Sequence, residues 1–238
     1  MYRIIISAKS INKRWIDGFA EIFGEYVEEN NGKILGYEDK GRFYKEFKLD
    51  VSAEAAKNEV RNALVTFYTT FVKSEYLSRR IVRYAKSDYL VQIYIKILSS
   101  FNLSDETAKL FELMSEIYEN FCLDGFYEFR MGAIIEGWEK LVGLSRDNSD
   151  LIRDEQSFAT LLRYMLSCLP SRSDSVSIDF CDDKFLIKSD KISKSLSSPD
   201  DVIFALIDLA PNKVYLSAAA GKTRIDEKIF GIFDAVYV

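Results

Sequence analysis

The chain has 238 residues, of which 48% are hydrophobic and 29% charged, and its formal net charge is −5. This composition is ordinary for a folded globular protein and excludes an intrinsically disordered chain. Histidine is absent, which excludes Ser-His and Cys-His nucleophile pairs and every imidazole metal ligand.

No stretch of 18 uncharged apolar residues occurs, so the sequence predicts no membrane span, and we expect a cytoplasmic protein. The three cysteines are odd in number and lack the close spacing of a zinc site. We expect them to be reduced, mostly buried thiols.

The first fifty residues predict a β-α-β-β segment. Residues 2–7 form a β-branched run suited to a strand, and apolar residues then recur at helical spacing from Ile11 to Val27. Asn30-Asn31-Gly32 is typical of a left-handed helix end. Two short strand candidates follow in residues 33–49, around a turn at residues 38–41.

Residues 51–170 predict a helical bundle. Ser52 and Ser104 are suited to cap two of its helices, and the apolar face of the second extends to Phe121. Helical spacing continues from Phe129 to Val142 and again from Phe158 to Leu169. Pro170 closes this region.

Beyond residue 170 the apolar period changes from about four to two. Residues 176–180 alternate cleanly and lead through Asp182-Asp183 into a second strand, which predicts a β-hairpin. Ser198-Pro199 is typical of a helix start. Residues 214–216 and 235–238 then read as strands around a helix at about residues 224–233, a unit that favours a parallel crossover.

The predicted fold class is therefore α+β, with a short N-terminal β/α segment, a central helical bundle, and a C-terminal β-hairpin plus strand-helix-strand unit. We expect three segments, at residues 1–50, 51–170 and 171–238. The sequence leaves open whether all three form a single domain. The sequence leaves open whether the two β segments share a sheet.

Charge is unevenly distributed in the central region. Residues 51–100 contain eight basic and four acidic residues, whereas residues 101–160 contain five basic and thirteen acidic ones. This pattern favours helices that complement one another, and it disfavours nucleic-acid binding because no basic field covers the chain. The alternative is a basic partner-binding face, with these candidate residues: Arg79, Arg80, Arg83 and Lys86.

Two further positions are candidate anion sites. Arg130 follows the aromatic segment Gly125-Phe126-Tyr127, where it could bind an anion or pair with a nearby glutamate. Lys222 lies in Gly221-Lys222-Thr223, but Leu216 stands where a phosphate-binding loop requires its first glycine. An ordinary loop is the simpler interpretation there.

A row of carboxylates is the only metal candidate. Glu112, Glu116 and Glu119 fall on one face of the predicted helix, opposite its apolar stripe, which favours a solvated surface over a cation site. The sequence thus predicts no metal site, no cofactor and no catalytic residue.

Four segments of the C-terminal half carry a resemblance: GFYEFRM at 125–131, FATLLRYM at 158–165, SVSID at 175–179 and FALIDLAPNKVYL at 204–216. In order and spacing they resemble the YtxC-like family of sporulation proteins, over about residues 122–238. Family patterns have histidine where Ser177 stands and near Ser217. The resemblance implies a cytoplasmic protein of an endospore-forming bacterium, and it implies no cofactor.

Our leading interpretation is a non-catalytic cytoplasmic protein, associated with sporulation, that acts through protein–protein contacts. We expect a protein partner, and a homo-oligomer stays open. The alternative is a small-ligand or nucleotide-binding enzyme that uses the C-terminal α/β segment.

Overall fold

The computed structural model describes residues 2–81, 88–171, 173–221, 223 and 225–238. The chain divides into two compact units: residues 1–77 with 102–140, and residues 78–101 with 141–238. The helical region predicted for residues 51–170 therefore contributes to both units. No helix in the described ranges is long and apolar enough to cross a membrane.

The first unit has a four-stranded sheet in the order β2-β3-β1-β4. Its elements in chain order are β1 (Tyr2–Lys9), η1 (Ser10–Asn12), α1 (Lys13–Glu29), β2 (Lys33–Asp39), β3 (Arg42–Leu49), α2 (Ala53–Thr66), η2 (Phe67–Val72), the start of α3 (Lys73–Ile81), α5 (Leu103–Leu113), β4 (Asn120–Cys122), α6 (Leu123–Arg130) and the start of α7 (Gly132–Asp147). Strands β2, β3 and β1 are antiparallel, and β4 joins β1 in parallel.

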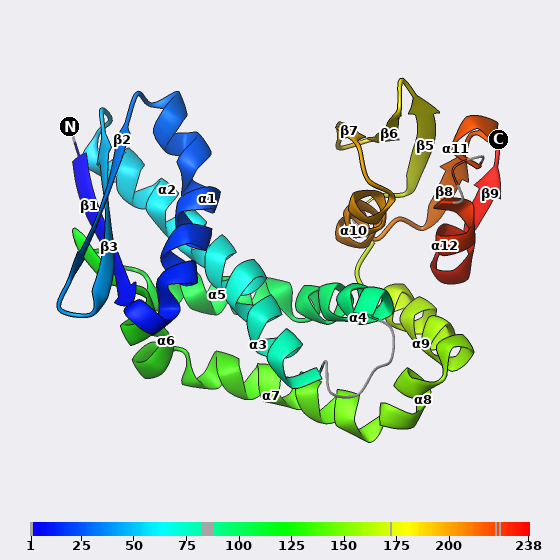
Figure 1. Cartoon of the computed structure of the whole chain (residues 1–238), viewed down its shortest axis with the longest axis horizontal. Helices are drawn as coiled ribbons and strands as arrows, with labels where there is room; N and C mark the ends of the chain where they lie inside the picture. The colour runs from blue at the N-terminus through cyan, green and yellow to red at the C-terminus, as the bar shows by residue number, and fades with distance from the viewer. Residues whose placement is uncertain (1, 82–87, 172, 222, 224) are drawn as a thin grey trace. The chain divides into compact units, whose positions relative to one another are not determined.

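Helix α1 covers one face of this sheet (Figure 1), and buried aromatic side chains join the two. The Phe47 ring of β3 lies 5.7 Å from the Phe19 ring and 5.3 Å from the Phe23 ring, between centroids. All three side chains are essentially inaccessible to solvent. The helical spacing of Phe19 and Phe23 in the sequence therefore places them on the sheet-facing side of α1.

The second unit has a five-stranded sheet in the order β7-β6-β5-β8-β9. Its elements are the end of α3, α4 (Asp88–Ser100), the end of α7, α8 (Ser149–Arg153), α9 (Glu155–Ser167), β5 (Ser175–Cys181), β6 (Lys184–Ser189), β7 (Ser193–Leu196), α10 (Pro199–Leu209), β8 (Lys213–Leu216), α11 (Ala218–Gly221), α12 (Ile225–Ile232) and β9 (Ala235–Tyr237). β5, β8 and β9 are parallel, whereas β6 and β7 are antiparallel.

The α+β class is confirmed, and so are several local predictions. The Ser52 hydroxyl accepts a hydrogen bond from the Ala55 amide, and the Ser198 hydroxyl accepts one from the Asp200 amide, as expected of helix caps. Asp182 and Asp183 adopt the left-handed conformation at the predicted hairpin turn. The two β segments lie in separate sheets, which answers the question that the sequence left open.

Three predictions in the helical region are wrong. Asn102, not Ser104, precedes α5, and that helix stops at Leu113, well short of Phe121. Phe121 instead lies in β4, opposite Ile6 of β1. The helix predicted over residues 129–142 is interrupted at Met131, where α6 ends and α7 begins.

Candidate functional site

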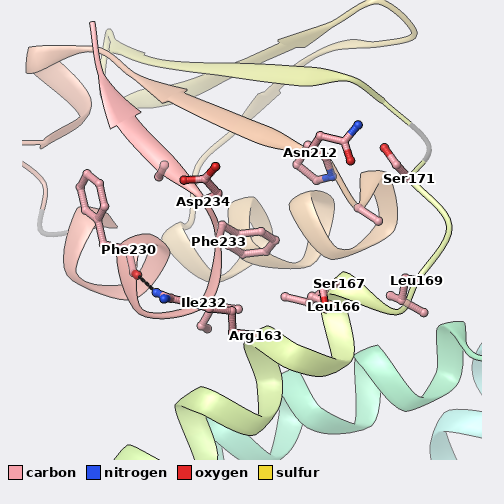
Figure 2. A pocket seen from close by; sticks show the side chains of 13 residues that line it. Arg163, Leu166, Ser167, Leu169, Ser171, Asn212, Phe230, Ile232, Phe233 and Asp234 are labelled. Carbon is pink, nitrogen blue, oxygen red and sulfur yellow. Dashed lines mark hydrogen bonds between the residues drawn. The ribbon is translucent and has the colours of Figure 1, made fainter.

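A pocket of about 500 Å³ lies in the second unit, at the edge of the sheet where the parallel strands begin (Figure 2). Asn212 directly precedes β8 and Asp234 directly precedes β9. The pocket's opposite wall comes from α9, which contributes Arg163, Leu166 and Ser167. A volume of this size is within the range of small-molecule sites.

The pocket combines an apolar floor with a polar rim. Its floor is formed by buried side chains: Leu166, Leu169, Ile232 and Phe233. Exposed polar side chains surround it: Arg163, Ser167, Ser171, Asn212 and Asp234. The Arg163 Nη2 donates a hydrogen bond of 2.6 Å to the Phe230 carbonyl, which ties α9 to α12 and fixes the guanidinium at the rim (Figure 2).

The loop that resembles a phosphate-binding motif lies at the other edge of the same strands. Ser217, which directly follows β8, donates a hydrogen bond of 2.6 Å to Asp179 and accepts one from the Ala220 amide. This donation from Ser217 holds the pKa of Asp179 below its ordinary value. Ligands of parallel α/β sheets bind beyond the carboxyl ends of the strands, and the pocket lies at the amino ends. The pocket and the loop are therefore separate features.

A buried ion pair is the most unusual polar feature of the first unit. Lys73 follows the π-helical turn η2, and its Nζ lies 2.9 Å from both carboxylate oxygens of Glu106. The Lys73 side chain is fully buried and that of Glu106 is 8% exposed. Trp138 donates its indole N–H to the same carboxylate at 3.1 Å.

Burial and pairing act against each other in this cluster. Burial lowers the pKa of Lys73 and raises the pKa of Glu106, while the charge of each partner counteracts these shifts. Buried ionisable groups with shifted pKa values are candidates for catalytic residues. The pocket described above does not include Lys73 or Glu106, and the contacts of this pair with Trp138 join α3, α5 and α7. We assign it a structural role.

A second polar cluster surrounds Asp124 at the start of α6. The Arg42 guanidinium donates a hydrogen bond of 2.8 Å to Asp124, and Cys122 donates one of 3.2 Å. Lys9 lies 3.7 Å from the other carboxylate oxygen, which has no hydrogen bond. Burial alone raises the pKa of Asp124, but the hydrogen bonds from Cys122 and Arg42 outweigh it, and the pKa lies below its ordinary value. This cluster joins β1, β3 and α6.

The edge strand β2 is exposed along its whole length. All seven of its residues are exposed, including Ile34 at 39%, Leu35 at 46% and Tyr37 at 46%. The Tyr37 ring stacks on Tyr44 of β3 at a centroid distance of 4.9 Å and an interplanar angle of 5°. In the described part of the chain no strand pairs with the outer side of β2. An open edge with large apolar side chains is a template for strand pairing.

The predicted site residues fall on different surfaces. Arg79 and Arg80 are exposed in the last turn of α3, and Arg130 is the exposed last residue of α6. Arg83, Lys86 and Lys222 lie outside the described residues. The interpretation of all six as partner or anion sites stays a prediction.

The expected pairing of basic and acidic helices has one clear instance, because Lys73 of α3 meets Glu106 of α5. The acidic row is wrong as a helix face, since α5 ends at Leu113 and leaves Glu116 and Glu119 outside it. Among the described residues no group of three acidic or cysteine side chains could hold a metal.

The prediction of mostly buried thiols is also wrong. Cys122 is half-buried, and Cys168 and Cys181 are exposed and free.

The sequence did not indicate the pocket or the exposure of β2. The strand itself was predicted, but nothing in its residues told which neighbour it would have in the sheet. Comparisons with known proteins add no identity: no family model, no curated protein and no solved structure matches this chain.

Proposed function

We propose that this protein is non-catalytic and acts by binding another polypeptide segment along the edge of β2. The observation that carries this proposal is the exposure of a seven-residue edge strand bearing Ile34, Leu35 and Tyr37. An extended segment that pairs with such an edge gains main-chain hydrogen bonds, and neighbouring side chains supply specificity.

The strand has few of the features that usually protect an edge, since its charged residues, Lys33, Glu38 and Asp39, lie only at its two ends. It contains no proline, its pairing with β3 is continuous from Lys33 to Asp39 without a bulge, and its only basic residue is at one end. Large side chains on an open edge would favour aggregation unless a partner covers them. A physiological partner resolves that conflict.

Affinity purification with the tagged full-length chain tests this function. Leu35→Lys should remove a specifically enriched partner, because it places a charge in the centre of the apolar stretch. Leu144→Lys is the matched control, since Leu144 is also an exposed leucine but belongs to the second unit. Equal capture by the wild type and Leu35→Lys would contradict the proposal.

The resemblance of residues 122–238 to the YtxC-like family supports sporulating cells as the material for this purification. That setting rests on the four sequence segments alone. A cytoplasmic location is part of the same proposal.

The pocket of the second unit favours a second candidate function, the binding of a small organic ligand. Its apolar floor suits a hydrocarbon or aromatic part, and Arg163, Asn212 and Asp234 can orient polar groups. A ligand at about 100 times its dissociation constant stabilises the folded state by roughly 2.7 kcal/mol. A thermal-shift screen of nucleotides and common metabolites should then show a shift of several degrees. A flat screen would contradict this candidate.

A further inference from the structure

The hairpin geometry determines which backbone groups of β2 are unpaired. Lys40 and Gly41 both have positive φ, 47° and 75°, as in the two-residue turns that join antiparallel strands. In such a hairpin the residues that flank the turn, Asp39 and Arg42, form a hydrogen-bonded pair, and bonded and non-bonded pairs alternate from there. The odd residues of β2 therefore bond to β3. Residues 34, 36 and 38 direct their N–H and C=O groups to the open edge.

The side chains of β2 divide between the two faces of the sheet. Ile34 is opposite Phe47, which packs on α1, so the even residues of β2 lie on the α1 face. Four residues therefore lie on the other face, in the order Lys33, Leu35, Tyr37, Asp39.

This order is self-complementary under a two-fold axis. An antiparallel copy of β2 centred on Gly36 pairs Lys33 with Asp39 of the copy, and Leu35 with Tyr37. The same register pairs residue 34 with 38 and Gly36 with itself, which are the positions whose backbone groups are unpaired. A shift of the copy by one residue would place residues whose backbone groups face the open edge opposite residues that already bond to β3, and these pairs could not exchange hydrogen bonds. A parallel copy in the same register would place like charges opposite each other.

Gly36 lies at the two-fold axis and brings no side chain to the place where the two copies would come closest. A Cβ built there would meet only the Tyr44 carbonyl, at 3.9 Å, so the face of the sheet is uncrowded at this position. We propose that the partner of β2 is a second copy of this chain, joined by an antiparallel β2–β2 pair centred on Gly36. This inference rests on the proposed function and specifies its partner. The two four-stranded sheets then form one continuous sheet with two-fold symmetry.

Charge substitutions test the pairing by sedimentation equilibrium, from about 1 to 500 µM chain. Since a short strand pair buries less than a standard interface, we expect a dissociation constant on the order of 10 µM. The average mass should rise with concentration from 27.4 kDa towards twice that value. Lys33→Glu alone should weaken association by roughly tenfold, because each copy then places a glutamate opposite Asp39 of the other copy.

The matched control reverses both charges. Lys33→Glu with Asp39→Lys should restore association, since the swapped charges are again complementary across the axis. Lys33→Glu should not weaken the hairpin itself, because residue 33 is opposite Lys48 of β3. Asp39→Lys, by contrast, places a lysine opposite Arg42 of β3, so thermal unfolding of each variant checks that the hairpin is retained. A mass of 27.4 kDa at every concentration would overturn the inference.

Engineered thiols test the register. In a background with Cys168→Ser and Cys181→Ser, which removes the exposed thiols, Gly36→Cys should form an intermolecular disulfide on oxidation. Directly opposed bonded residues have Cα atoms about 5.5 Å apart, which is within disulfide range. Ile34→Cys should not link to itself, but it should link to Glu38→Cys when the two variants are mixed. A disulfide in Ile34→Cys alone would overturn this register.

The experiments distinguish failure of the second-copy inference from failure of the proposed function. A chain that stays monomeric, while Leu35→Lys still abolishes capture of a different protein, would overturn the second-copy inference and leave the proposed function standing. If neither self-association nor capture responds to changes in β2, both are wrong.

Discussion

Replacing one partner of the buried pair Lys73–Glu106 should destabilise the first unit in a pH-dependent way. In Glu106→Leu the buried ammonium of Lys73 loses both carboxylate contacts, each 2.9 Å long. Its least costly response is to lose its proton. From an ordinary pKa of about 10.4, this costs about 4.6 kcal/mol at pH 7, which sets an upper bound. Breaking a buried pair typically costs about 3–5 kcal/mol. The expected loss therefore lies between about 3 kcal/mol and the bound of about 4.6 kcal/mol.

The reverse substitution has the opposite pH dependence. In Lys73→Met the Glu106 carboxylate can take up a proton, at a cost of at most about 3.7 kcal/mol at pH 7 from an ordinary pKa of about 4.3. The folded Lys73→Met protein then holds a proton that the unfolded chain releases, so its deficit shrinks as the pH falls. In Glu106→Leu the unfolded chain binds the proton instead, and the deficit shrinks as the pH rises. Each trend is about 1.4 kcal/mol per pH unit at most.

Urea unfolding followed by tryptophan fluorescence provides the assay. Both tryptophans of the chain, Trp15 and Trp138, lie in the first unit, so the signal reports that unit. The double variant, Lys73→Met with Glu106→Leu, should recover to within about 2 kcal/mol of the wild type, because no unpaired charge remains. A loss below about 1 kcal/mol in Glu106→Leu, or equal losses at pH 6 and pH 9, would show that Glu106 does not stabilise a buried charge on Lys73.

Three other outcomes are expected. Because the pKa of Asp124 is depressed in the folded state, its carboxylate stabilises the fold above about pH 4, and this stability is lost as the pH falls through the depressed value. On acid titration Asp124→Asn should therefore lose less stability than the wild type, and identical profiles would contradict this. Gly18→Ala should lower the free energy of unfolding by about 1–3 kcal/mol, because the added Cβ would lie 2.7 Å from the Phe71 ring. Gly24→Ala, on the same helix, has open space and should raise it by up to about 1 kcal/mol. Equal urea midpoints for the two variants would count against this packing. A ligand found by thermal shift should lose its effect in Phe233→Ala if it occupies the pocket, and a retained shift would place it elsewhere.

Local chemistry accounts for what the sequence predicts well. The cap at Ser198, the turn at Asp182-Asp183 and the amphipathic spacing of α1 depend on residues a few positions apart, and the structure confirms each. The same kind of signal failed at Phe121, because its strand forms only by pairing with β1, more than a hundred residues earlier. Helical periodicity carries no information about such a distant pairing.

The candidate sites show the same limit. Lys73 and Glu106 read as members of a basic and an acidic segment, and only the tertiary structure buries them together. Likewise Lys33 to Asp39 read as a strand, while its place at the edge depends on the order of the whole sheet. On one face of β2 two apolar residues lie between a basic and an acidic residue. This order makes the strand self-complementary and is visible in the sequence, but it indicates an interface only once the strand is known to lie at the edge.

Hydrogen–deuterium exchange of the β2 amides, measured at low and high protein concentration, shows whether the edge of β2 is an interface. We expect slow exchange at residues 35 and 37 under both conditions, because these amides bond to β3. At residues 34, 36 and 38 we expect fast exchange in dilute protein and protection at high concentration. If exchange at these positions stays fast at every concentration, and stays fast with any captured partner present, then the edge of β2 is not an interface.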